Sequence, residues 1–158
     1  MVTRVPQAGI QRVTDSRMTR PGPLKRGFWR DWSPAVAWCG LIFLQSAFPT
    51  PDVLPHWANL DKAIHAGVYA VLAVLMCHGL YSLPGWRQHT LRICVCGALF
   101  AALYGASDEW HQSFVAGRTA DVLDWLADLV GAVAGSGLYM YARRRLSRLE
   151  SLQRRQQF

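Results

Sequence analysis

The sequence predicts an all-α integral membrane protein, a bundle of four transmembrane helices with both termini cytoplasmic. Four apolar segments approach the length of about 20 residues that a bilayer core requires. Basic residues lie almost entirely outside these segments, and 51% of the 158 residues are hydrophobic. These observations predict three regions: a basic, disordered arm at 1–31, a membrane domain at 32–142 and a basic tail at 143–158.

The first predicted span is Trp32 to Phe48, which contains 17 residues. Ser33-Pro34 is a good helix start, because proline is favoured in the first turn, and Pro49 is expected to end the helix. A cleaved signal peptide is an open alternative. It is the weaker one because about 30 residues would precede the apolar region. A start of the chain at Met18 also stays open.

The other three spans are separated by loops with clear turn signals. A proline-rich loop, Pro49 to Leu60, precedes the second span, which begins at Asp61 and stays uncharged from Ala63 to Trp86. Ser82-Leu83-Pro84-Gly85 predicts a turn. The third span is predicted at Leu91 to Gln112, the next connection at Ser113 to Thr119, and the fourth span at about Ala120 to Tyr141, followed by Arg143-Arg144-Arg145.

The distribution of basic residues predicts the orientation. Fifteen of the seventeen Lys and Arg residues lie in the two tails and the 82–92 loop, which leaves only Lys62 and Arg118 on the other side. Under the positive-inside rule, the termini are cytoplasmic and the acidic loops face outward from the inner membrane. The loop with Asp52 belongs to this outer face.

Carboxylates at the start of the fourth span are the main sign of a site. On a helix, Asp121, Asp124, Asp128, Gly131 and Gly135 share one stripe at about 100° per residue. The uncharged remainder of the span is too short to cross a bilayer, so the acids are expected to lie below the interface. Acids at this depth are costly and usually face protein, and Gly-x-x-x-Gly permits close helix contact.

The ends of the second and third spans carry further polar residues that the topology brings to the same outer face. If Lys62 and Arg118 pair with the acids, the cluster only holds the helix ends together. The acids outnumber these two basic residues, however, and this excess favours a ligand site. Both interpretations stay open. The candidate ligand-binding residues are Asp61, Lys62, His65, Asp108, Glu109, His111, Gln112, Arg118, Asp121, Asp124 and Asp128.

Other classes of function are disfavoured. The net charge of +7 resides in the tails, without a nucleic-acid-binding motif, so no nucleic-acid partner is expected. The four cysteines lie in apolar segments without metal-ligand spacing, and we expect them to be buried small hydrophobes. The acids gather at one end of the spans, which argues against a continuous proton pathway.

Two motifs resemble the VanZ-like family. They are Asp61-Lys62-x-x-His65 and the run from Ser107-Asp108-Glu109 through Gly117-Arg118 to Asp124, followed by Gly131-x-x-x-Gly135. The resemblance covers about Trp32 to Tyr141. It implies a small multi-span membrane protein of a family named for a member tied to low-level teicoplanin resistance. Many members carry Asn where this chain has Asp128.

The leading hypothesis is a membrane protein that binds a polar or lipid-linked envelope component at its outer face and so alters glycopeptide susceptibility. Its partners would be membrane lipids and an anionic or lipid-linked ligand, with Arg118 as a planar donor and Lys62 as a point charge. The alternative is a metal-dependent hydrolase or transferase, with ligands among the carboxylates, His65 and His111, and Glu109 as base.

Overall fold

The computed structural model describes residues 24–49 and 60–156 of the chain, and these residues form four helices. The predicted all-α class is therefore confirmed. The predictions for residues 1–23 and for the loop that contains Asp52 lie outside this part of the chain. The helices are α1 (Leu24–Ser46), α2 (Leu60–Ser82), α3 (Thr90–Gln112) and α4 (Val122–Gln156).

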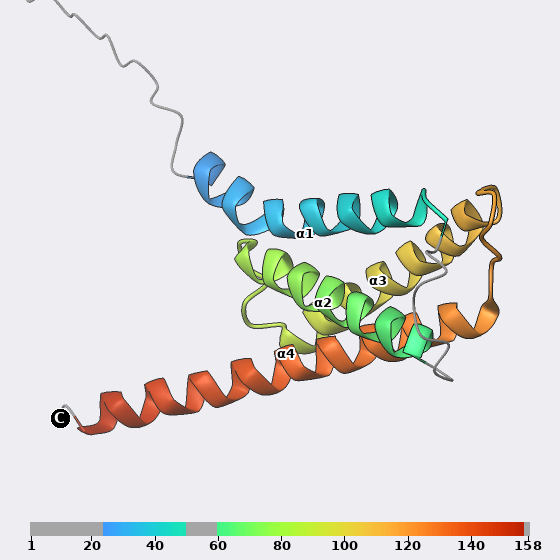
Figure 1. The fold of residues 1–158 in the computed structure, drawn as a ribbon. Helices are drawn as coiled ribbons and strands as arrows, with labels where there is room; N and C mark the ends of the chain where they lie inside the picture. The colour runs from blue at the N-terminus through green and yellow to red at the C-terminus, as the bar shows by residue number, and fades with distance from the viewer. Residues whose placement is uncertain (1–23, 50–59, 157–158) are drawn as a thin grey trace, which may run out of the picture.

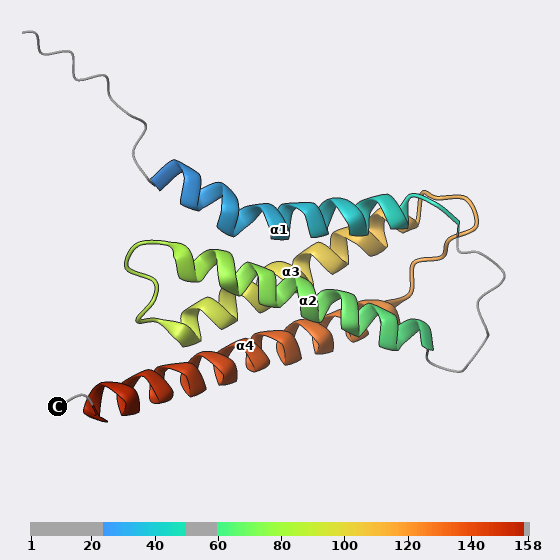
Figure 2. The ribbon, with the colours of Figure 1, turned by 60° about the vertical axis from the view of Figure 1, so that its left-hand side comes forward.

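The four helices run back and forth along one direction, so that their ends gather at two opposite ends of a bundle. α2 and α3 lie between α1 on one side and α4 on the other, and the second half of α4 extends beyond the bundle (Figures 1 and 2). The end of α1, the start of α2, the end of α3 and the start of α4 meet at one end. The predicted polar residues belong to this end.

Three of the helices, α2, α3 and α4, are long and apolar enough to cross a membrane by length and composition. α1 is not among these candidates, because its first turns carry charged residues such as Arg30 and Asp31. The prediction of multiple membrane-spanning helices is thus confirmed for the second, third and fourth segments.

Large apolar side chains on the outside of the helices support this assignment. Leu103 on α3 and Val130 on α4 are more than half exposed, and so is Leu44 on α1. A soluble monomer rarely exposes contiguous apolar surface of this extent. Acyl chains are the natural environment for these faces.

The predicted start of the first helix was wrong. α1 begins at Leu24, so residues 24–31 are helical and do not belong to a disordered arm, and Pro34 lies inside the helix. An interior proline removes one main-chain hydrogen bond and bends the helix instead of starting it. Figures 1 and 2 show α1 bending in its first half.

The fourth helix continues past its predicted end. α4 does not stop near Tyr141 but runs through the arginine-rich segment to Gln156. Arginine and leucine are good helix formers, so the basic tail extends the helix beyond its apolar portion. Arg143 stacks over the ring of Tyr81 at 3.9 Å, which joins α4 to the end of α2.

Close contact between α2 and α4 depends on two glycines of α4. A Cβ atom at Gly131 would collide with the main-chain carbonyl of Ala66, and one at Gly135 with that of Ala70. The predicted contact of Gly-x-x-x-Gly with a neighbouring helix is confirmed, and this neighbour is α2. The polar stripe of α4 is thereby turned toward α2.

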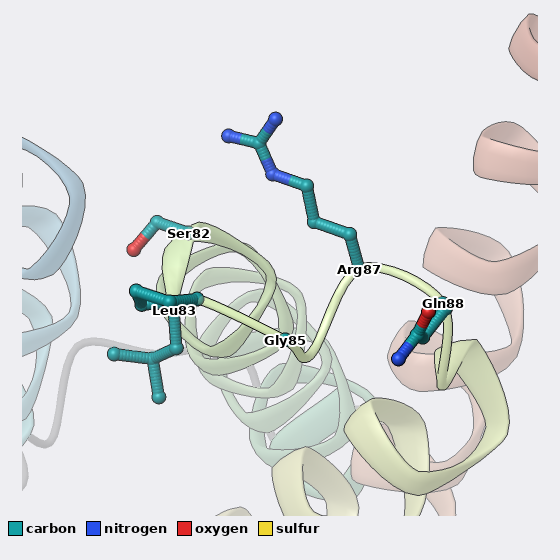
Figure 3. A pocket seen from close by; sticks show the side chains of 6 residues that line it. Ser82, Leu83, Gly85, Arg87 and Gln88 are labelled. Carbon is teal, nitrogen blue, oxygen red and sulfur yellow. The ribbon is translucent and has the colours of Figure 1, made fainter.

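The turn between α2 and α3 marks the opposite end of the bundle. Gly85 has a φ of +79°, which suits glycine, and confirms the predicted turn. An open depression of about 390 Å³ lies there, and Figure 3 shows Leu83 beside it and the Arg87 side chain extending away from the turn. The depression lacks a cluster of titratable groups. All four cysteines are free. Cys77 and Cys94 are buried as predicted, whereas Cys39 and Cys96 are only half-buried.

Candidate functional site

Lys62, in the first turn of α2, is the centre of a cluster of ion pairs. Its Nζ lies 2.8 Å from Asp124 Oδ1 of α4, 3.1 Å from Asp61 Oδ2 and 3.4 Å from Asp121 Oδ2. The side chain of Asp124 is only 17% exposed, whereas that of Asp61 is 59% exposed. The pair of Lys62 with Asp124 is therefore the least solvated of the three and the one that fixes α2 against α4.

A second polar pair lies one turn deeper. His65 Nδ1 of α2 is 3.0 Å from Oδ1 of Asp128, whose side chain is completely buried. When Asp128 is ionised it can only accept, so Nδ1 is the donor, and in the neutral imidazole Nε2 then carries no proton. Asp128 Oδ2 has no partner among the described residues and points toward Gly105, where a Cβ would come within 2.7 Å of it.

Glu109 joins the end of α3 to the start of α4. It is 8% exposed, and its Oε2 accepts a hydrogen bond of 2.9 Å from the main-chain N–H of Asp121. Its Oε1 is buried without a hydrogen-bond partner in the described part of the chain. A buried carboxylate oxygen in this state is costly, which makes it a candidate ligand atom.

Asp121 is the N-terminal cap of α4. Its Oδ1 accepts a hydrogen bond of 2.8 Å from the N–H of Leu123. This bond, with the nearby Lys62 ammonium, lowers the pKa of the Asp121 carboxyl. Because the pKa is lowered, the ionised Asp121 stabilises the folded protein at neutral pH, and this stabilisation is lost as the pH falls through that pKa.

Asp108 and Gln112 form a separate buried pair on α3. The amide of Gln112 donates to Asp108 Oδ2 at 3.0 Å, and both residues are more than 90% buried. This bond links residues one turn apart on the same helix, and it stabilises the last turn of α3.

Among the described residues, Arg118 forms no ion pair with an acid and contacts main-chain carbonyls instead. Its Nε donates to the carbonyl of Phe48 at 2.9 Å, and its Nη2 donates to the carbonyl of Gln45 at 3.1 Å. Gly117, with a φ of +80°, precedes it in the α3–α4 connection. Arg118 therefore ties that connection to the last turn of α1, because unsatisfied carbonyls at a helix end are strong acceptors.

The placement of His111 with the other metal-ligand candidates was wrong. Its ring packs against Phe43 of α1 with 4.7 Å between the ring centroids, and its Nδ1 is buried without a partner among the described residues. His111 lies about 100° from Gln112 around α3, which directs it toward α1 and away from α4. His65 is the histidine of the cluster.

A shallow depression of about 220 Å³ opens beside the cluster, between the end of α3 and the start of α4. Glu109 and Asp121 supply its polar part, and the ring of Trp125 forms an apolar wall. Trp125 is fixed by a hydrogen bond of 3.0 Å from its Nε1 to the carbonyl of Ala102. The depression thus combines charged and apolar walls.

One set of potential metal ligands was not predicted as a set. Ligand atoms of His65, Glu109 and Asp124, on three different helices, all lie within 4.8 Å of one another. The hydroxyl of Tyr69, which the sequence did not single out, is buried without a partner in the described residues. No sequence spacing connects these residues, because each comes from a different helix or face.

Comparison with known proteins identifies the family. Residues 32–143 match the model of the VanZ/LLP1 family, which is most of the chain. No curated protein and no solved structure gives a significant match. The matched region contains all eleven candidate ligand-binding residues, the helices α2 and α3, and the apolar first part of α4. The chain is therefore a multi-pass membrane protein that belongs to the VanZ/LLP1 family.

Proposed function

We propose that this protein binds a polar or lipid-linked component of the cell envelope at the polar end of its helix bundle. The bundle lies in the inner membrane, with α1 as a fourth span and both termini cytoplasmic. By holding this component the protein alters envelope properties such as susceptibility to teicoplanin. The eleven candidate residues all belong to this polar end. Among them, the residues around Lys62 are proposed to contact the ligand.

The observation that carries the proposal is that two buried carboxylates are not fully hydrogen-bonded. Asp128 and Glu109 are buried, yet each has one oxygen without a partner among the described residues. If these acids served only to hold the helices together, both oxygens of each carboxylate would have hydrogen-bond partners, because each buried oxygen without one costs about 1–3 kcal/mol. Polar groups that are retained at this cost in a membrane protein usually mark a site.

The charge distribution supports an outward-facing site. The polar end carries Lys62 and Arg118, whereas the opposite end carries Arg87, Arg92 and the arginines that follow Tyr141. Under the positive-inside rule the arginine-rich end is cytoplasmic. The depression between α3 and α4 then opens at the outer surface of the membrane, where lipid-linked envelope precursors are accessible.

The lining of the depression indicates the kind of ligand. Glu109 and Asp121 accept hydrogen bonds, so they suit hydroxyl, amide or ammonium donors on a head group, while Trp125 and Val122 suit an attached apolar chain. The Lys62 side chain is 26% exposed, so its ammonium can add one contact to an anionic group. Two N–H donors of Arg118 already bind carbonyls of α1 and the residues that follow it. Arg118 therefore contributes to the site by holding the α3–α4 connection in place.

Lipid co-purification tests the proposal. The protein is purified in mild detergent, and bound envelope lipids are identified by mass spectrometry for the wild type, Glu109→Gln and Glu150→Gln. Glu150 is an exposed acid near the end of α4 and provides a matched control. We expect a head-group-bearing lipid that is enriched with the wild type and with Glu150→Gln but depleted by at least about fivefold with Glu109→Gln.

Cells provide the second part of the test. We expect Glu109→Gln, but not Glu150→Gln, to lose the protein's effect on teicoplanin susceptibility at equal membrane abundance. Equal lipid profiles for all three proteins, with equal susceptibility, would contradict the proposed binding at this end of the bundle.

A further inference from the structure

His65 has the geometry of a metal-binding histidine held by a carboxylate. Asp128 accepts from Nδ1 at 3.0 Å, and this fixes the ring and leaves Nε2 as the nitrogen that can bind a cation. Ligating histidines usually donate their other ring N–H to a carboxylate or a carbonyl, which orients the ring and raises its basicity. The complete burial of Asp128 makes this support rigid.

Glu109 supplies an independent sign of a missing cation. It is more than 90% buried, and its Oε1 has no partner among the described residues. The other oxygen, Oε2, is held by the N–H of Asp121, so the carboxylate cannot turn freely toward water. The ligand atoms of Glu109, His65 and Asp124 lie within 4.8 Å of one another.

The charge around this set also favours a cation. The cluster contains five carboxylates (Asp61, Glu109, Asp121, Asp124 and Asp128), and three of them, Asp61, Asp121 and Asp124, share the ammonium of Lys62. Among the described residues, no second Lys or Arg contacts these acids. Lys62 contacts Asp124 through Oδ1, which leaves Oδ2 for a second cation. A divalent ion would reduce the excess negative charge in a region that borders apolar helices.

We propose that His65, Glu109 and Asp124 form a binding site for one divalent transition-metal ion of the Zn²⁺ type, with Asp128 as the residue that orients His65. One nitrogen and two carboxylate oxygens are a known zinc ligand set, and a fourth position is left for water or a ligand. Neighbouring ligands of tetrahedral zinc lie about 3.4 Å apart, so the three side chains draw together on binding. The inference concerns metal binding alone and does not depend on which envelope component the protein binds.

Zinc titration of the full-length protein tests the site. Detergent-purified protein is stripped with a chelator and titrated with Zn²⁺ by calorimetry, for the wild type, His65→Ala, Glu109→Gln and Asp61→Asn. Asp61 carries the same charge and contacts Lys62 but is not in the ligand set. We expect one ion per wild-type chain, an affinity loss of at least about tenfold for His65→Ala and Glu109→Gln, and a change below about threefold for Asp61→Asn.

Spectroscopy of the wild type covers the case in which a ligand variant fails to fold. Mn²⁺ replaces Zn²⁺, and electron spin echo modulation detects imidazole nitrogen bound to the ion. We expect the nitrogen signal in the wild type and in Asp61→Asn. The proposal would be overturned if the wild type lacked this signal or bound no stoichiometric zinc. It would also be overturned by an equal affinity loss in all three variants, because that result is expected of zinc held by the acidic surface as a whole.

Discussion

His65 on α2 and Asp128 on α4 form a hydrogen-bonded pair of 3.0 Å in which the carboxylate is completely buried. The pair lies one turn below the ion pairs of Lys62, so the polar cluster has an exposed layer and a buried layer. The two residues are 63 positions apart in the chain. Their contact is therefore a tertiary one that holds α2 against α4.

A double-mutant cycle should reveal this contact. We expect His65→Ala and Asp128→Ala each to lower the free energy of unfolding by about 1–3 kcal/mol, because each leaves a polar partner unpaired. The coupling energy should be about 0.5–3 kcal/mol, measured by reversible unfolding in mixed micelles. Asp128→Asn keeps an acceptor for Nδ1 and should retain most of the stability. Strictly additive effects would show that the pair does not form in the membrane.

Substitution of glycines on α4 should separate close packing from helix propensity. Gly131→Ala places a Cβ against the carbonyl of Ala66, and we expect a loss of about 1–3 kcal/mol from overpacking. Gly137→Ala is the control on the same helix, because nothing lies within 4 Å of the added Cβ. It should be neutral or stabilising by up to about 1 kcal/mol. Equal effects of both changes on the unfolding free energy would contradict the α2–α4 contact.

Arg118→Gln should loosen the end of α1. The change removes charged donors from the carbonyls of Gln45 and Phe48, so we expect amide hydrogen exchange in the last turn of α1 to rise by roughly tenfold. Arg87→Gln, at the turn on the opposite end, is the matched control and should leave that exchange unchanged. If Arg118→Gln also left it unchanged, the tie to α1 would not exist in solution.

Single cysteines in a cysteine-free background should reveal the orientation. A cysteine at Ala116, in the α3–α4 connection, should react with a membrane-impermeant maleimide in cells whose inner membrane is intact. Cysteines at Gln88 and Ser147 should react only after the inner membrane is opened. All three positions are exposed, so access depends on the side of the membrane. Labelling of Gln88 alone in intact cells would reverse the proposed orientation.

The sequence predicted the acid and glycine stripe of α4 well, because helix geometry alone fixes which residues share a face. Asp124, Asp128, Gly131 and Gly135 do face protein as expected. The helical turns of α1 before Trp32 were missed. Charged residues there hide the helical tendency of the segment when membrane length is judged by apolar residues alone.

The partners of polar side chains were harder to predict than their positions. The sequence left open whether Arg118 pairs with the acids or donates to a ligand, and the α3–α4 connection places it beside carbonyls at the end of α1. Likewise, His65, Glu109 and Asp124 come together from three helices, and no spacing within one segment predicts such a set. Both relationships depend on how loops and helix ends close in three dimensions.

Photocrosslinking at the depression tests the central claim most directly, namely that the polar end of the bundle holds an envelope ligand. Benzoylphenylalanine replaces Ala120, which lines the depression, or Ala134, which is exposed on the apolar part of α4. After illumination in cells, adducts are identified by mass spectrometry. We expect Ala120 to yield a lipid-linked or other polar envelope component that is absent at Ala134 and is lost with Glu109→Gln. The same bulk phospholipid adducts at both positions would contradict the account.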